Sequence, residues 1–65
     1  MTIDEWLKKE GRSGRWLARK LGRGEDVVSR WRRGHIRPSL TVLGLIEEIT
    51  GGEVMPEDYG YGEKE

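Results

Sequence analysis

The chain has 65 residues and no cysteine, and its 12 Lys and Arg residues balance its 12 Asp and Glu residues. A chain this short forms one domain with a small core, and the lack of cysteine excludes a disulfide framework and a thiolate zinc site. No apolar run approaches the roughly 20 residues of a membrane span, and the N-terminus lacks the apolar core of a signal peptide. We therefore expect a cytoplasmic protein with no membrane association.

The charges are unevenly distributed along the sequence. Residues 1–37 contain eleven Lys and Arg against five Asp and Glu, whereas residues 38–65 contain one Lys against seven Asp and Glu. Such an asymmetry indicates nucleic-acid contact by the basic half, combined with an acidic tail. The alternative is a chance distribution over a solvated surface. We interpret residues 1–58 as the folded domain and residues 59–65 as a short, flexible acidic tail.

The first two predicted helices span about residues 3–10 and 14–21. Thr2 and Glu5 have the spacing of a capping box at the start of the first helix. Ser13 is suited to cap the second helix, because its hydroxyl can accept a backbone N–H of the first turn. The apolar residues of the first helix have the i, i+3, i+4 spacing of an inward face: Ile3, Trp6 and Leu7. The burial of Trp16 in the second helix stays open.

A short turn containing Gly22 and Gly24 leads to a third predicted helix over about residues 25–33. On a helical wheel Val28 and Trp31 point inward. The outward face is short, polar and rich in arginine: Asp26, Ser29, Arg30 and Arg33. Two helices joined by a tight turn, the second with such a face, form the helix-turn-helix arrangement that enters the DNA major groove.

The segment after Gly34 is predicted to be a basic loop. Pro38 restricts Arg37 to extended geometry, and we expect Ile36 to anchor the loop to the core. The basic residues around this loop are suited to phosphate contacts, which position a protein without reading sequence: Arg32, Arg33, His35 and Arg37. His35 has no second ligand at useful spacing, so we expect no metal site.

A fourth predicted helix is capped by Ser39, runs to about residue 50 and ends at two glycines. Its apolar stripe covers roughly 200° of the wheel, wider than is usual for a surface helix. Either a second subunit covers part of this stripe, or the last segment or the first helix does. The first alternative assigns a dimer interface to Val42, Leu45, Ile49, Val54 and Tyr59. Pro56 suits the first position of a further short helix.

With these segments in view, the chain resembles the Cro/C1-type (lambda-repressor-like) helix-turn-helix family, in particular small Cro-like regulators of phages and prophages. The matching stretches are residues 16–22, 28–34, 37–39 and 46–52, in the family's order. The resemblance implies an all-α fold: a compact bundle of four to five short helices with a central helix-turn-helix. Family members usually bind inverted-repeat operators as dimers and repress transcription.

By position, the resemblance implies base contacts from Glu25, Asp26, Ser29 and Arg30. We predict phosphate contacts from six other residues: Ser13, Arg15, Arg23, Arg33, His35 and Arg37. Positions 25 and 26 often carry Gln, Ser or Thr in the family, whereas both are acidic here. A carboxylate repels phosphate but can accept a hydrogen bond from cytosine N4. We favour a role at the helix macrodipole for Glu25, and leave Asp26 open between that role, a base contact and an ion pair with Arg30.

The sequence therefore favours a sequence-specific regulator of transcription that binds double-stranded DNA, most simply a homodimeric repressor of a phage, prophage or plasmid operon. The alternative is a protein-interaction module, antitoxin-like or adaptor, on a helix-turn-helix scaffold. We do not expect an enzyme, because the acidic pairs are adjacent in sequence and diverge on a helix. No nucleophile, metal set or phosphate loop accompanies them, so no cofactor or small-molecule substrate is expected.

Overall fold

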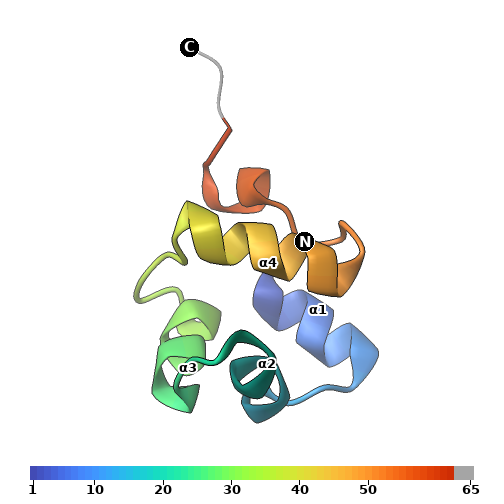
Figure 1. The fold of residues 1–65 in the computed structure, drawn as a ribbon, viewed down its shortest axis with the longest axis vertical. Helices are drawn as coiled ribbons and strands as arrows, with labels where there is room; N and C mark the ends of the chain where they lie inside the picture. Colours follow the sequence, from blue (N-terminus) through green and yellow to red (C-terminus); the bar gives the residue numbers. More distant parts are fainter. Residues whose placement is uncertain (63–65) are drawn as a thin grey trace.

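The computed structural model describes residues 1–62 as four α-helices followed by one short 3₁₀ helix, η1. The elements are α1 (Ile3–Glu10), α2 (Gly14–Leu21), α3 (Glu25–Arg33), α4 (Leu40–Thr50) and η1 (Pro56–Tyr59). In the view of Figure 1, α2 and α3 lie below α4 and η1 lies above it. The predicted all-α bundle of short helices is confirmed. Within residues 1–62, no helix is long and apolar enough to cross a membrane.

The helix ends are set by short-range capping, as the sequence predicts. Thr2 and Glu5 form the capping box of α1, with each side chain accepting the other residue's backbone N–H. The hydroxyls of Ser13 and Ser39 each accept an N–H from the third residue along the chain. Each of the four α-helices then ends at a glycine in the left-handed region, with φ between 66° and 79°: Gly11, Gly22, Gly34 and Gly51.

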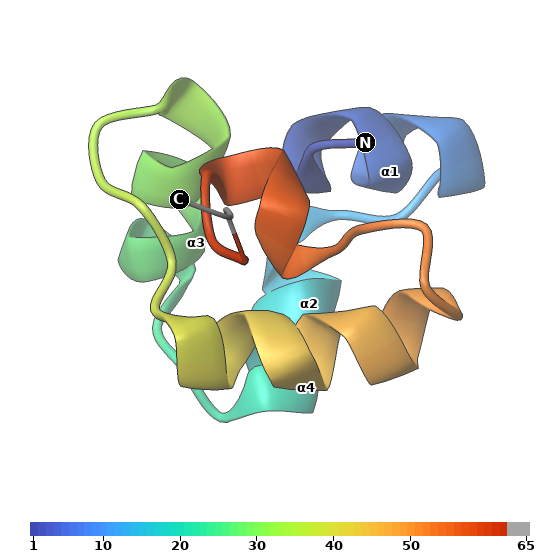
Figure 2. The ribbon, with the colours of Figure 1, turned by 90° about the horizontal axis from the view of Figure 1, so that it is seen from above.

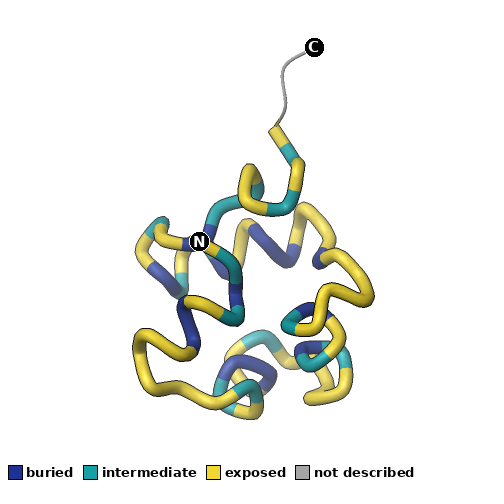
Figure 3. Tube along the Cα trace, turned by 180° about the vertical axis from the view of Figure 1, so that it is seen from behind, coloured by how far each residue is buried: buried dark blue, intermediate teal, exposed yellow. Residues whose placement is uncertain are grey.

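The core receives apolar side chains from every α-helix. Figure 2 shows the arrangement of the helices from above, and Figure 3 marks the buried stretches along the chain. The most deeply buried members of the core are Ile3, Leu7, Leu17, Val28, Leu43, Ile46 and Val54. Trp16, whose burial was open, is half-buried and stacks on Trp6 with 6.0 Å between the ring centroids. The guanidinium of Arg12 lies 4.6 Å from the centroid of the Trp16 ring, a cation–π contact at this edge of the core.

Two predictions about apolar residues are wrong. Ile36 is exposed and does not anchor the loop before α4; the neighbouring Pro38 is buried and does so. Val42 and Val54 were assigned to a dimer interface, but both are buried within the single chain. The Val54 N–H donates a hydrogen bond to the Thr50 hydroxyl. This bond helps to hold the segment after α4 against the core, where the Val54 side chain is buried.

The segment after α4 is packed against the domain as far as residue 62. The Tyr59 hydroxyl accepts the N–H of Ile3, one of the first-turn amides of α1 that have no intrahelical partner. The Tyr61 hydroxyl donates to the Pro38 carbonyl, and the Arg37 guanidinium lies 4.2 Å from the Tyr61 ring centroid. The predicted start of the flexible tail at residue 59 is therefore wrong; residues 63–65 lie outside the described residues.

The packing of this segment also bears on the two alternatives for the wide apolar stripe of α4. Because η1 contacts α4, the last segment covers part of that stripe. Leu45 remains exposed and Ile49 half-buried, so they are the part of the predicted dimer interface on α4 that solvent still reaches.

The substitution Tyr59→Phe should lower the free energy of unfolding by about 1 kcal/mol, because the Ile3 N–H loses its acceptor while the ring remains in place. Urea denaturation followed by circular dichroism measures the change. Glu57→Gln, at an exposed position of the same short helix, is the matched control and should stay within about 0.5 kcal/mol of the parent. Equal stability of Tyr59→Phe and the control would mean that η1 does not brace α1.

Candidate nucleic-acid interface

The core fixes which face of α3 reaches solvent. Val28 and Trp31 of α3 are buried in the same cluster as Leu17 and Ala18 of α2. Successive residues turn by about 100° on a helix, so this packing directs the opposite side of α3 outward. The residues predicted for DNA contact on that side are Asp26, Arg30 and Arg33, which are exposed, and Ser29, which is half-buried.

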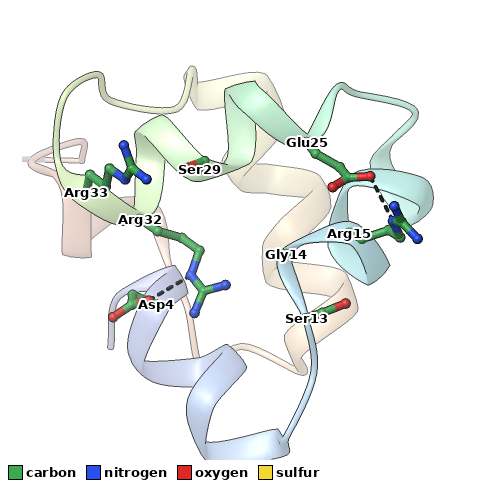
Figure 4. A pocket seen from close by; sticks show the side chains of 8 residues that line it. All are labelled: Asp4, Ser13, Gly14, Arg15, Glu25, Ser29, Arg32 and Arg33. Carbon is green, nitrogen blue, oxygen red and sulfur yellow. Dashed lines mark hydrogen bonds and ion pairs between the residues drawn. The ribbon is translucent and has the colours of Figure 1, made fainter.

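A hollow of about 590 Å³ opens between α1, the N-terminus of α2 and α3. Figure 4 shows its lining, which consists of Asp4, Ser13, Gly14, Arg15, Glu25, Ser29, Arg32 and Arg33. Five of the residues predicted to contact DNA lie together here: Ser13, Arg15, Glu25, Ser29 and Arg33. The structure thus brings predicted base contacts and predicted phosphate contacts to the same side of the molecule.

The N-terminus of α2 forms one wall of the hollow. Ser13 satisfies the Trp16 N–H, whereas the first-turn amides of Gly14 and Arg15 have no partner within the helix. Arg32 of α3 packs closely against this wall: a Cβ on Gly14 would lie 3.4 Å from its Nη1 atom. Free amides at a helix N-terminus attract anions, and guanidinium groups bind phosphate oxygens in a matched geometry. The wall can therefore accept a phosphate group.

Two ion pairs across the hollow were not predicted from the sequence. Arg15 Nε lies 2.8 Å from Glu25 Oε2 and joins α2 to the start of α3. Arg32 Nε lies 2.7 Å from Asp4 Oδ1 and joins α3 to α1 (Figure 4). Lys8 Nζ is 3.1 Å from the other Asp4 oxygen. Hydrogen bonds from Arg32 and then Lys8 hold the pKa of the Asp4 carboxyl below its ordinary value.

The two acidic residues at the start of α3 have different surroundings. Glu25, for which we favoured a macrodipole role, lies in the first turn of α3 and also pairs with Arg15. The Asp26 carboxylate turns back toward the helix end, where a Cβ on Gly24 would lie 2.5 Å from its Oδ1 atom. A glycine at the N-cap thus leaves room for Asp26 at the positive end of the helix dipole. Among the described residues, Asp26 and Arg30 form no ion pair, so that alternative is wrong.

The remaining predicted phosphate contacts lie outside the hollow. Arg23 is exposed in the turn between α2 and α3, and His35 is exposed after α3. Arg37 donates a hydrogen bond to the Tyr59 carbonyl and covers the Tyr61 ring, so its guanidinium holds the C-terminal segment. We therefore no longer assign Arg37 to phosphate binding.

The chain matches no protein-family model, no curated protein and no solved structure. The resemblance described above accordingly depends on the residues of this chain alone.

Acidification should weaken the fold through Asp4. Since its folded-state pKa is lowered from 3.8, its stabilising effect is complete above that value and is lost as the pH falls through the lowered pKa. Asp4→Asn should therefore be less stable than the parent near neutral pH, and the difference should shrink in strong acid. Melting temperatures from about pH 7 to about pH 2 measure this difference.

Lys8→Met is the companion variant, and it should have a smaller effect because Arg32 is the main partner of Asp4. A difference between Asp4→Asn and the parent that stays constant across the whole pH range would contradict the role of the carboxylate.

Proposed function

We propose that this chain is a sequence-specific regulator of transcription that binds double-stranded DNA: a homodimeric, cytoplasmic, nucleoid-associated repressor of the Cro/C1 helix-turn-helix type. The observation that carries the proposal is the shared side of α2 and α3. There the α2 N-terminus, an exposed polar face of α3 and three guanidinium groups lie around one hollow: Arg15, Arg32 and Arg33. A phosphate-accepting wall beside an exposed helix is the arrangement needed to place that helix in a major groove.

In this proposal the position of each residue determines whether it contacts a base or a phosphate. Arg30, exposed on the middle of α3, reads guanine through O6 and N7, the commonest specific base contact. Ser29 lies next to it and can donate or accept at a neighbouring base edge. Ser13 and Arg33, which line the hollow, bind phosphate groups and fix the register of the protein on DNA.

A dimer would set two copies of α3 about 34 Å apart on one face of the duplex, which matches an inverted-repeat operator. The burial of Val42 and Val54 removes them from the interface, so the proposed contact surface is the solvent-accessible edge of α4 formed by Leu45 and Ile49. These residues are four apart and therefore lie on the same side of the helix. Repression would follow from blocking polymerase at the operator of the chain's own operon.

A second candidate function, a protein-interaction module, is favoured by one observation. Two of the arginines around the hollow are already paired with carboxylates, Arg15 with Glu25 and Arg32 with Asp4, which reduces the attraction for DNA. The deciding experiment is a fluorescence-anisotropy titration at about 150 mM salt, where non-specific affinity is weak. One duplex is the DNA upstream of the chain's gene and the other is its shuffled copy.

Tight binding to the upstream duplex alone, with two chains per site, is the result expected of the regulator. Weak and equal binding to both duplexes would be followed by selection from random sequences. If the selection returns no preferred sequence, the interaction module is the better explanation.

Arg30→Ala should abolish the preference for one guanine in each half-site, a loss of about 1–3 kcal/mol in discrimination. Competition among single-base variants of the bound duplex measures the preference. The matched control is Arg33→Ala, which should weaken binding to all sequences alike and reduce the salt slope by about one phosphate contact. If Arg30→Ala keeps the parent's full preference profile, the residue does not read a base.

Leu45→Glu should convert the dimer into a folded monomer, because a charge at the centre of an apolar contact must be desolvated without a partner. Sedimentation equilibrium measures the mass, and circular dichroism checks the helices. Ile36→Glu, which adds the same charge at an equally exposed apolar residue outside α4, is the control and should leave the dimer intact. A parent protein that sediments as a monomer at high concentration would argue against this interface.

A further inference from the structure

The two ion pairs of the hollow differ in how easily they can open. The side chains of Arg32 and Asp4 are 27% and 30% exposed, and Lys8 pairs with the second Asp4 oxygen. The side chains of Arg15 and Glu25 are 64% and 57% exposed. Ion pairs in such exposed positions are worth at most about 1 kcal/mol. The Arg15–Glu25 pair can therefore exchange partners more easily than the less exposed Arg32–Asp4 pair.

The exchangeable pair lies where a phosphate would have to bind. Arg15 is the second residue of α2, beside the free amides of the helix N-terminus, and it lines the hollow together with Ser13. Glu25 is the first residue of α3, on the same hollow. Glu25 accepts one hydrogen bond, from Arg15 Nε to its Oε2 atom. A phosphate that binds the guanidinium through two oxygens along its Nε edge takes this same donor.

We propose that Glu25 is an internal competitor for DNA phosphate and a specificity-determining residue of the DNA-binding function proposed above, on which this inference rests. In the free protein Glu25 neutralises Arg15. A phosphate that binds Arg15 through its Nε edge displaces the Glu25 carboxylate, which then faces DNA. Where no amine of a base lies within reach, that carboxylate meets only like charge and acceptor atoms, so the exchange is unfavourable.

A favourable exchange needs a donor for the displaced carboxylate. The exocyclic amine of cytosine presents such a donor in the major groove, and acidic side chains accept from it. At a site with a cytosine within reach of Glu25, Arg15 gains a phosphate and Glu25 gains a base. Elsewhere Arg15 stays with Glu25 and contributes nothing to binding. The pair thereby lowers affinity for non-operator DNA more than affinity for the operator.

The test uses Glu25→Gln on a random-sequence duplex, because this substitution frees Arg15 while keeping the size of the side chain. One additional phosphate contact should steepen the dependence of log K on log salt by about 0.9. Equivalently, the ratio of variant to parent affinity should be about 3.5-fold larger at 50 mM than at 200 mM salt. Fluorescence anisotropy over this salt range gives both quantities.

Arg15→Gln is introduced into the parent, into Glu25→Gln and into Asp26→Asn. Comparison of the three separates the exchange from a general effect of charge. Arg15→Gln should reduce the salt slope by about 0.9 in the Glu25→Gln background and by clearly less in the parent. The matched background is Asp26→Asn, which removes the same charge one residue along the chain but breaks no ion pair with Arg15; there Arg15→Gln should behave as it does in the parent. Coupling seen only with Glu25 supports the proposal.

Equal effects of Arg15→Gln in all three backgrounds, with measurable DNA binding, would overturn the exchange but leave the DNA-binding function standing. No binding by the parent or by Glu25→Gln even at 50 mM salt would overturn the function as well. The two failures are therefore distinguished within one data set.

Discussion

The burial of Val28 and Trp31 is the constraint on which the rest of the candidate site depends. Because a helix has a single orientation once one face is packed, these two side chains set the outward direction of Arg30 and Arg33 together. They also bring the start of α3 to the N-terminus of α2, where the hollow forms. Truncating such buried side chains removes contacts that are worth several kcal/mol, a large fraction of the stability of a domain this small.

The hollow contains groups that attract anions and carboxylates that partly cancel this attraction. Three guanidinium groups and a helix N-terminus favour anions, while Asp4 and Glu25 neutralise two of those groups in the free protein. The two carboxylates do different work: Asp4 ties α1 to α3, whereas Glu25 occupies an exposed arginine. A net charge of zero is therefore compatible with the proposed DNA binding, because it is the arrangement of charges around the hollow that matters.

The C-terminal segment supplies part of the stability that a short chain lacks. A domain of this size buries only about 60% of the surface that its unfolded chain exposes, so each additional covered face counts. Tyr59 reaches α1, Tyr61 reaches the loop before α4, and Arg37 holds both tyrosines from outside. Through these contacts the last segment covers part of α4, and it leaves Leu45 and Ile49 for any second subunit.

The sequence by itself determined the helices and the direction of their faces. Caps, glycine stops and apolar spacing act over three or four residues, so the boundaries of α1 to α4 and the inward position of Val28 and Trp31 could be predicted. Only the tertiary structure decided the contacts between elements, because packing sets their geometry. These contacts join residues 10, 28 and 56 positions apart: Arg15 with Glu25, Arg32 with Asp4, and Tyr59 with Ile3.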